Sequence, residues 1–284
     1  AIMFTGDHEY IYNATFINCT SVGRGGAVFL QDNHNVTFEL CTFINNEALG
    51  IANNTWKNYT QERDDSNKDT KIDYKLTGHG GAIAFDVDAT NCTIKYSQFI
   101  NNSARRNGGA LNFDAGALNN TLLYSNFTDN IVDDDGGAIN WEGSLGLIKG
   151  IICNNNVGLG DKGSTSKGGT ICLTGNNVTI SDSKFISGRV YANVSAGAKD
   201  NETFAGGLFI TGNYTIIKNC TFDDCVALED GGALYVIGDD CELHNSTFTK
   251  NNAGDDGGAI YWTGANGYVE NITCSNNKVT GQTA

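Results

Sequence analysis

One motif recurs nine times along the 284 residues, and its spacing limits the possible fold more than any other feature. Each copy has a Phe or Cys, with an apolar residue five positions earlier. A repeat of about 26 residues that keeps an apolar column through every copy is typical of a solenoid, in which each copy packs against its neighbours. The Phe or Cys positions are Phe16, Phe43, Phe99, Phe127, Cys153, Phe185, Phe222, Phe248 and Cys274.

A second motif, Gly-Gly followed by an aliphatic residue, alternates with the first. After the glycines, bulky apolar residues occupy every second position, as at Ile83 and Phe85 or at Ile139 and Trp141. This period of two predicts short strands, and no long stretch carries a helical period. The Gly-Gly pairs begin at Gly25, Gly80, Gly108, Gly136, Gly168, Gly206, Gly231 and Gly257.

The two motifs together predict an all-β chain folded as a right-handed parallel β-helix of about nine coils. Successive coils pair at a spacing of about 4.8 Å, so equivalent residues stack into columns along the rod. We expect Phe rings to stack on Phe rings, and the Asn residues three positions later to form amide ladders. We interpret residues 1–284 as a single β-helix domain that is a piece of a longer surface protein.

The composition narrows the class of function. The net charge of −14 argues against nucleic acid or an anionic membrane as the partner, because both select for basic patches. No run of about 18 apolar residues occurs, so the sequence predicts no insertion into a membrane. The chain also has no Pro and 36 Gly, which indicates regular turns built from glycine.

The nine Cys residues are odd in number and show no zinc-like spacing. Most of them share columns with small residues or replace Phe or Asn, so we expect buried free thiols rather than a disulfide framework. Asn-x-Ser/Thr sequences are abundant, which indicates either glycosylation of an exported chain or only the frequency of Asn and Thr at strand ends. Examples begin at Asn13, Asn35, Asn58, Asn126, Asn177, Asn213 and Asn245.

The spacing between the two motifs varies greatly at one place only. From the Asn column to the next Gly-Gly, the step is six positions in five copies, such as Asn102 to Gly108, and much longer in three others. These three excursions, near 47–79, 157–167 and 189–205, therefore leave the rod at one corner. Insertions gathered at one corner of a solenoid usually mark a binding face, although a corner that merely tolerates insertions produces the same pattern.

Aromatic side chains in the excursions are the candidates for partner binding. The largest excursion holds Trp56, Tyr59 and Tyr74 with a charged run around Arg63, and the third excursion carries Tyr191. Aromatic residues on polar loops suit contact with carbohydrate or protein. The alternative is that these rings pack back on the rod.

Charged residues before the glycines lie in register if the β-helix is correct. Arg105 and Arg106 then face Asp133 and Asp134 of the next coil as exposed ion pairs. Further along, acids stack on acids, and either solvent screens them or a calcium ion bridges them. The four calcium candidates are Glu229, Asp230, Asp255 and Asp256. We expect no other cofactor.

Enzymes that cleave polysaccharides also use the parallel β-helix. Two fragments, GHG at 78–80 and GDDC at 238–241, resemble polygalacturonase motifs, and Asp239 and Asp240 are acid candidates for inverting hydrolysis. In that family GDDC closely precedes GHG, whereas here the order is reversed and about 160 residues intervene. His79 and Asp240 are then about five coils, or roughly 25 Å, apart. We therefore expect that the chain is not an enzyme.

The paired GGA[ILV] and F-x-x-N repeats resemble those of chlamydial polymorphic membrane proteins, and equally those of adhesin-like surface proteins of methanogenic archaea. The resemblance covers essentially the whole chain, with departures at GGTI (168–171) and GGLF (206–209). The missing Pro and the many sequons favour the archaeal group. The resemblance implies adhesion to other cells, and we expect an extracellular adhesin at the cell surface that binds another cell through its surface glycans or proteins. The alternative function is a passive structural stalk.

Overall fold

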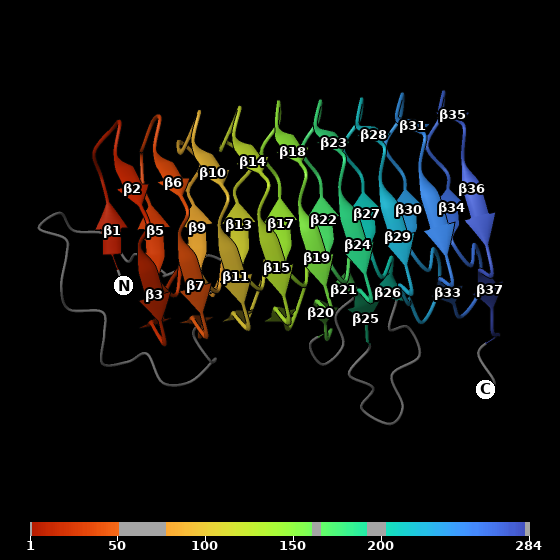
Figure 1. Ribbon diagram of the computed structural model, residues 1–284, viewed down its shortest axis with the longest axis horizontal. Coiled ribbons are helices and arrows are strands. Elements are labelled where there is room, and N and C mark those ends of the chain that lie inside the picture. The colour runs from red at the N-terminus through yellow and green to blue at the C-terminus, as the bar shows by residue number, and fades with distance from the viewer. Residues whose placement is uncertain (1, 51–77, 161–165, 192–202, 282–284) are drawn as a thin grey trace, which may run out of the picture.

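The computed structural model describes residues 2–50, 78–160, 166–191 and 203–281. These residues form an all-β rod in which each strand pairs in parallel with its equivalent in the next coil (Figure 1). The parallel β-helix predicted from the repeat is thus confirmed, whereas the hand of the coil and the number of complete coils stay predictions. The described residues contain no helix that is long and apolar enough to cross a membrane.

Three parallel sheets of nine strands each make up the body of the rod. The first sheet contains β1 (Ile2–Phe4), β5 (Val28–Leu30), β9 (Ile83–Phe85), β13 (Leu111–Phe113), β17 (Ile139–Trp141), β22 (Ile171–Leu173), β27 (Leu208–Ile210), β30 (Leu234–Val236) and β34 (Ile260–Trp262). The second sheet contains β2 (Tyr10–Tyr12), β6 (Thr37–Glu39), β10 (Thr93–Lys95), β14 (Thr121–Leu123), β18 (Leu147–Lys149), β23 (Thr179–Ser181), β28 (Ile216–Lys218), β31 (Glu242–His244) and β35 (Tyr268–Glu270). The third sheet contains β3 (Thr15–Ile17), β7 (Thr42–Ile44), β11 (Gln98–Ile100), β15 (Asn126–Thr128), β19 (Ile152–Asn154), β24 (Lys184–Ile186), β29 (Thr221–Asp223), β32 (Thr247–Thr249) and β36 (Thr273–Ser275).

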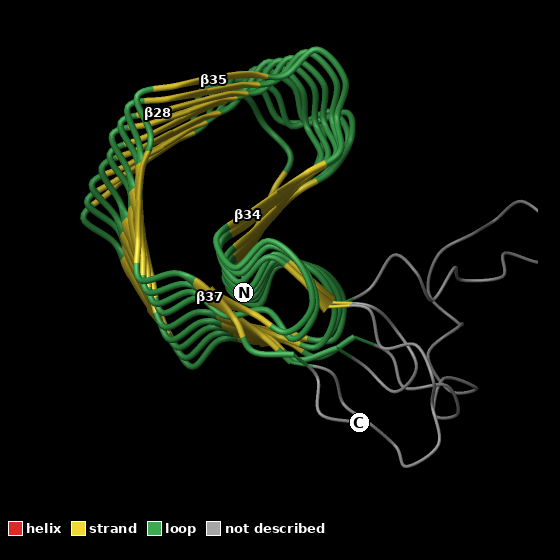
Figure 2. Ribbon diagram, turned by 90° about the vertical axis from the view of Figure 1, so that its right-hand side faces the viewer, coloured by secondary structure: helices red, strands yellow, loops and turns green. Residues whose placement is uncertain are grey.

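A fourth, narrower sheet of six strands follows the third sheet in six of the coils and leads to the glycine turn. Its strands are β4 (Thr20–Ser21), β8 (Glu47–Ala48), β12 (Ser103–Ala104), β16 (Ile131–Val132), β20 (Val157–Gly158) and β25 (Arg189–Val190). Two further pairs join β21 (Ser166–Lys167) to β26 (Thr203–Phe204) and β33 (Asn252–Ala253) to β37 (Lys278–Val279). Seen along the axis, the fourth sheet and the glycine turn form a small lobe beside the first sheet (Figure 2).

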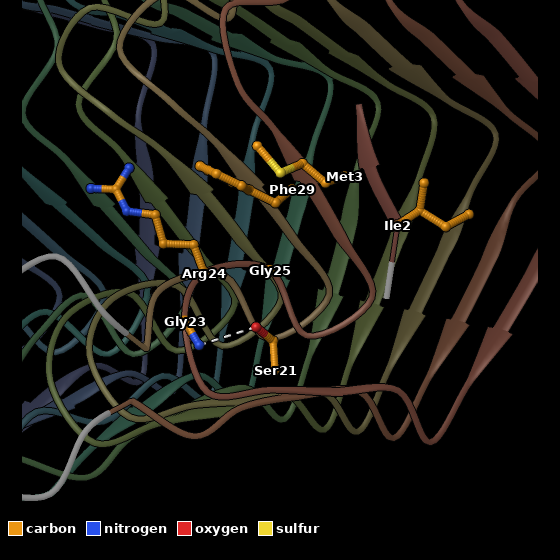
Figure 3. Close-up of a pocket in the computed structure, with 7 residues that line it drawn as sticks. All are labelled: Ile2, Met3, Ser21, Gly23, Arg24, Gly25 and Phe29. Carbon is orange, nitrogen blue, oxygen red and sulfur yellow. Dashed lines mark hydrogen bonds between the residues drawn. The ribbon is translucent and has the colours of Figure 1, made fainter. Parts of the chain in front are cut away.

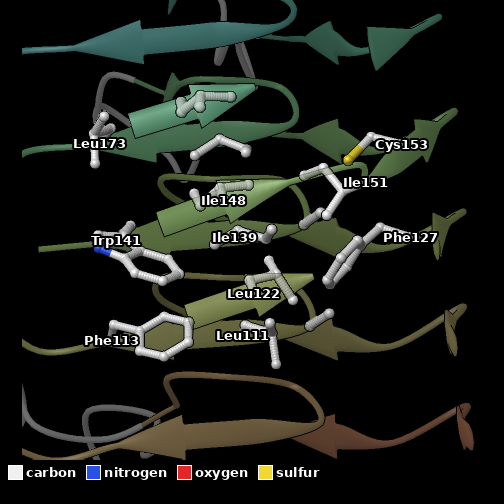
Figure 4. Packing of buried hydrophobic residues seen from close by; sticks show 14 of the residues in the cluster. Leu111, Phe113, Leu122, Phe127, Ile139, Trp141, Ile148, Ile151, Cys153 and Leu173 are labelled. Carbon is white, nitrogen blue, oxygen red and sulfur yellow. The ribbon is translucent and has the colours of Figure 1, made fainter. Parts of the chain in front are cut away.

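The core consists of the predicted columns. Phe99 and Phe127 stack with ring centroids 4.7 Å apart and planes 2° apart, and Cys153 continues the column (Figure 4). Trp141 is fully buried among the aliphatic residues of the first two sheets, and its indole N–H donates to the carbonyl oxygen of Gly143. Burial of each such side chain contributes about 1.5–3 kcal/mol. The apolar columns therefore hold successive coils in register.

The predicted Asn ladder is also present. Asn102 Nδ2 donates to Asn130 Oδ1 over 3.0 Å, and Asn130 Nδ2 donates to Asn156 Oδ1 over 2.9 Å. The same Oδ1 atoms also accept from the backbone N–H of the preceding coil, as in Asn102 N to Asn130 Oδ1. All three Asn residues are fully buried, so the ladder satisfies polar groups that water does not reach.

Exposed Asn residues form other columns at the corners between sheets. Asn13, Asn35, Asn177 and Asn245 have φ between 47° and 60°, the left-handed region that Asn tolerates better than other non-glycine residues. In each case a Thr two positions later begins a strand. The fold thus accounts for these sequons without a glycan. Asn58 lies outside the described residues, and glycosylation stays a prediction.

The prediction of buried free thiols is confirmed for most cysteines. All nine are free and seven are buried, whereas Cys19 is partly buried and Cys274, in the last described coil, is exposed. Burial raises the pKa of Cys92 to about 11 and that of Cys225 to about 12. Thiols with raised pKa values are poor nucleophiles, so these residues act as small apolar side chains.

Two details of the fold were not part of the sequence prediction. The outward residues Asn112, Asn140 and Phe209 of the first sheet are at most 3% exposed. The lobe packs against this face and buries it. At AGGL (205–208), the Gly-Gly pair also stands one residue closer to the following strand than in the other copies. Ala205 (φ 59°) occupies the left-handed position that the first glycine holds elsewhere, because Leu208 pairs with Ile171.

Candidate functional site

The fourth sheet is the place where the three longest variable segments leave the rod. β8, β20 and β25 are members of this one sheet, and the segments 51–77, 161–165 and 192–202 begin two or three residues after them. Coils without a long excursion, such as the one containing β16, continue directly into the glycine turn. The variable segments therefore originate at one corner, as the spacing indicates.

The two ends of the largest segment lie against each other. A Cβ atom added at Gly78 would lie 2.8 Å from the Cα of Gly50, and both glycines have positive φ. Gly78 N–H donates to Gly23 O over 2.7 Å, and Arg106 N–H donates to Gly78 O over 2.8 Å. Ala48–Gly50 and Gly78–Gly80 together hold one residue more than Ala104–Gly108 of the next coil, so the backbone ladder continues past this point with a single extra residue. Residues 51–77 are inserted into the lobe without breaking the stack of coils.

One of the five candidate binding residues, Tyr191, lies within the described residues. Tyr191 directly follows β25, its side chain is 41% exposed, and its backbone N–H donates to Gly158 O over 2.8 Å. Its ring is therefore available at the corner where the excursions begin. The other four candidates lie outside the described residues, and their role in binding stays a prediction: Trp56, Tyr59, Arg63 and Tyr74.

The residues that immediately precede the left-handed glycine position form a second feature of the lobe, the pre-glycine column. Arg24 in this column pairs with Asp86 at 2.9 Å and also with Asp114, both of which follow first-sheet strands. Its guanidinium lies 6.0 Å from the Phe29 ring centroid. The column thus ties the lobe to the outer face of the first sheet. Its members are Arg24, His79, Asn107, Asp135, Lys167, Phe204, Asp230 and Asp256.

Asp135 is the most perturbed acid of this column. Its Oδ1 accepts from the backbone N–H of Lys167 over 2.9 Å. Burial, reinforced by the charge of Asp134, raises the pKa of Asp135 to about 7, against the opposing charge of Lys167. Of the predicted Arg–Asp pairs, Arg106 lies 3.9 Å from Asp134, which is the loose contact expected of an exposed ion pair.

The four calcium candidates stack as predicted, and the side chain of one of them, Asp230, bonds to the backbone of the next coil. Asp230 Oδ1 accepts from the N–H of Asp256 over 2.9 Å, and the N–H groups of Gly254 and Asp255 donate to Glu229 O. Burial raises the pKa of Asp230. Among the described residues, no group of three or more His, Cys, Asp or Glu side chains could hold a metal ion. Calcium binding stays a prediction.

An aromatic cluster that the repeat did not predict covers the outer face of the first sheet toward its C-terminal end. The rings of Phe209 and Tyr235 lie 5.3 Å apart, and Phe204 lies 4.7 Å from Tyr235. Lys167 Nζ is 5.5 Å from the Phe209 ring centroid. The outward residues of β27, β30 and β34 are all aromatic, including Tyr261, and this column was the available signal. The cluster gives the lobe its own small apolar core.

The motif fragments that resemble polygalacturonase lie in different parts of the rod. His79 precedes β9 and Asp240 follows β30, and four strands of the first sheet separate these two. Asp239 Oδ1 accepts from Ala265 N–H over 2.7 Å, and Asp240 Oδ1 accepts from Asn266 Nδ2 over 3.1 Å. These carboxylates connect neighbouring turns of the rod.

A pocket lies at the N-terminal edge of the rod, and its lining is mostly apolar (Figure 3). Ile2 and Met3 come from the edge strand β1, and Phe29 comes from β5. Ser21 Oγ accepts from Gly23 N–H over 3.1 Å. The lining offers no pair of carboxylates or acid–base couple, so this pocket has no catalytic constellation.

Comparison with known proteins finds a family match for one stretch of the chain. Residues 245–261, which span β32, β33 and the glycine turn before β34, match the Chlamydia polymorphic membrane protein repeat. The resemblance to the chlamydial repeats is confirmed for this stretch. No curated protein matches the chain. The Streptococcus pneumoniae surface protein and adhesin PfbA aligns over 94% of this chain and 91% of its own, at 11% identity and a TM-score of 0.23, which is too low to support an argument.

Proposed function

We propose that this chain is the β-helical part of an adhesin-like, extracellular cell-surface protein, and that it binds its partner through the segments that leave the fourth sheet. The observation that carries the proposal is their common origin: three segments of different length follow β8, β20 and β25 of one sheet. The repeat match at 245–261 supports a surface protein of the adhesin-like type. The partner is another cell, contacted through its surface glycans or proteins.

A deletion of residues 51–77 tests this proposal. Because Gly50 and Gly78 already lie in contact, joining them removes the segment and leaves only one residue more than the next coil has over Ala104–Gly108. We expect an unchanged melting temperature and lost binding to cells that the intact chain binds. A deletion that started at Ala48 would instead remove a buried residue of β8. The smaller deletion is therefore the cleaner experiment.

The matched control replaces residues 161–165 with Gly and Ser at equal length. This segment leaves the same sheet but holds no aromatic residue, so cell binding should persist. Equal binding by the 51–77 deletion and the intact chain would refute the site. If the intact chain binds no cells, it acts as a passive stalk that holds another domain outward.

We also propose that the chain has no polysaccharide-cleaving activity. The support is the separation of His79 from Asp240 along the rod and the engagement of Asp239 and Asp240 with neighbouring turns. Incubation with a panel of pectins should release neither reducing ends nor unsaturated products. Release of either product, lost in an Asp240→Asn variant, would reverse this assignment.

A further inference from the structure

The corner between the second and third sheets contains a column of nine residues with positive φ. Six of the nine are Asn, Asp or Gly, the types that reach the left-handed region at least cost. The three exceptions are Leu40, Tyr96 and Tyr124, at φ 54°, 53° and 45°. The column consists of Asn13, Leu40, Tyr96, Tyr124, Gly150, Asp182, Asn219, Asn245 and Asn271.

The three exceptions carry a conformational cost without gaining burial. Leu40, Tyr96 and Tyr124 are 44%, 49% and 44% exposed, so their side chains add little to the core. Bulky residues are genuine outliers in the left-handed region, and such outliers persist where surrounding structure or function requires them. The other six coils have Asn, Asp or Gly at this position, which adopt the left-handed region at a lower conformational cost. The rod itself therefore does not require the three bulky side chains.

The exceptions lie side by side and form one surface, the tyrosine strip (Leu40, Tyr96 and Tyr124). They follow the neighbouring strands β6, β10 and β14. The two Tyr rings stack with centroids 5.5 Å apart and planes 8° apart. A Cβ atom at Gly150, in the next coil, would lie 2.4 Å from a ring carbon of Tyr124. Glycine at this position therefore leaves room for the ring.

The surroundings of the strip are polar but locally neutral. Glu39 pairs with Lys95 at 2.9 Å, and Lys149 pairs with Asp182 at 3.6 Å. Gln98 lies two positions after Tyr96 and is exposed on the third sheet, as Asn126 is after Tyr124. On a chain with a net charge of −14, an aromatic strip with paired charges and amides around it fits an uncharged partner.

The size of the strip decides between the uncharged partners. Three coils extend about 10 Å from the first to the last Cα, at about 4.8 Å per step. A stable protein interface buries about 800 Å² per partner and involves some 20–30 residues, which three side chains do not approach. A sugar ring is of the right size: its C–H groups pack against the exposed parts of the stacked Tyr rings, and its hydroxyls bond to amides.

We propose that the tyrosine strip is a binding site for a neutral glycan, separate from the segments at the fourth sheet. The inference rests on the adhesive function proposed above and assigns that function a second, residue-level contact. Leu40 and the two Tyr rings provide the apolar platform, and Gln98 and Asn126 provide the amides that reach the sugar hydroxyls.

The test measures binding of the purified chain to chitohexaose, cellohexaose and mannohexaose, with hexagalacturonate as the charged comparison, by titration calorimetry. The test variant combines Tyr96→Asn with Tyr124→Asn, and thus introduces the commonest residue of this column, which four of the nine coils use. We expect at least a tenfold loss of affinity for the neutral oligosaccharide that binds, and a melting temperature that is unchanged or higher. The Tyr96→Phe variant keeps the ring and should retain binding.

Tyr214→Asn is the matched control. Tyr214 also has positive φ (56°) and is 54% exposed, but it stands at another corner, between Asn177 and Asp240 in the adjacent coils. Its replacement should leave binding unchanged. The proposal is overturned if no neutral oligosaccharide binds at millimolar concentration, if hexagalacturonate binds better, or if the double variant still binds. Lost binding with a lower melting temperature would assign the rings a structural role and also overturn it.

Two further measurements distinguish this proposal from the proposed function. The 51–77 deletion should still bind the neutral oligosaccharide, because the strip lies in other sheets. If the chain binds cells through 51–77 but binds no glycan, the proposed adhesive function stands and the proposed role of the tyrosine strip is refuted. A dimer in sedimentation velocity that the double variant disperses would assign the strip to a second copy, against the proposal.

Discussion

The first and third sheets have nine parallel strands each and the same alternation of apolar and other residues, yet their outer faces differ. In the third sheet, outward residues such as Asn126 and Lys184 are exposed. In the first sheet, the outward residues Asn112 and Asn140 are buried, because the lobe covers them. The difference teaches that a period of two shows which side chains point into the core, but not what covers the opposite face.

The largest predicted change in the free energy of unfolding comes from substitutions on the inner faces, where the two sheets should respond alike. Phe127→Ala in the third sheet and Phe113→Ala in the first sheet should each lower the free energy of unfolding by about 3–5 kcal/mol, because each leaves a cavity in a stacked column. Phe127 stacks on Phe99 at 4.7 Å, and Phe113 lies 4.0 Å from Trp141. Urea unfolding measures both changes.

The control for this pair is Thr128→Ala, on the outer face of β15. This residue is only partly buried, so the change should stay within about 0.5 kcal/mol. A loss below about 1 kcal/mol for either Phe variant would show that its column is not the main source of stability.

Substitutions on the outer faces should lower the free energy of unfolding by different amounts in the two sheets. Asn140 Nδ2 donates to Asn112 Oδ1 and to Glu142 Oε1, each over 2.9 Å, beneath the lobe. Asn140→Ala leaves the buried Asn112 Oδ1 without its donor and should cost about 1–3 kcal/mol. Asn126→Ala, on the exposed face of the third sheet, is the matched control and should cost under about 0.5 kcal/mol. Equal losses for the two Asn variants would contradict the difference in burial.

Most of the fold was predictable from sequence, because stacking makes each column visible as a repeat. The Phe column, the Asn ladder and the corner of the excursions all follow from the spacing of two motifs. The one-residue shift at Ala205 was not predictable from the glycines alone, since Ala takes the left-handed position there. It becomes visible only from the pairing of Leu208 with Ile171.

The candidate sites were less predictable, and the reasons differ. The aromatic column that contains Phe209 and Tyr235 is visible in the sequence, but no local pattern specifies that Phe204 of the lobe packs on it. The tyrosine strip depends on backbone conformation. Leu40, Tyr96 and Tyr124 follow strands at equivalent positions, but only the positive φ values show that they are exceptional there. Exposure and φ together identify them.

The smallest predicted effect depends on pH and lies in the lobe that covers the first sheet. The pKa of Asp135 is about 7 in the fold, against about 3.8 for an ordinary Asp, because the carboxyl is partly buried and lies beside Asp134. The folded state therefore holds this proton to higher pH than the unfolded state. The contribution of Asp135 to stability falls as pH rises from about 4 to about 7, and is constant above. Asp135→Asn removes this loss while keeping an oxygen for Lys167 N–H.

A pKa rise from 3.8 to about 7 corresponds to about 4 kcal/mol at most, and solvent reduces this value because Asp135 is only partly buried. The Asn variant should therefore match the parent chain near pH 4 and exceed its free energy of unfolding by about 1–2 kcal/mol at pH 8, which urea unfolding at both pH values measures. Lys167→Gln should change the free energy of unfolding in the opposite direction. The Lys charge lowers the pKa of Asp135, so without it the ionised Asp135 should destabilise the fold further at pH 8. An Asn variant with the same advantage at pH 4 and pH 8 would mean that Asp135 affects packing rather than proton binding. The cover over the first sheet would then be insensitive to pH, and the two sheets would differ in burial alone.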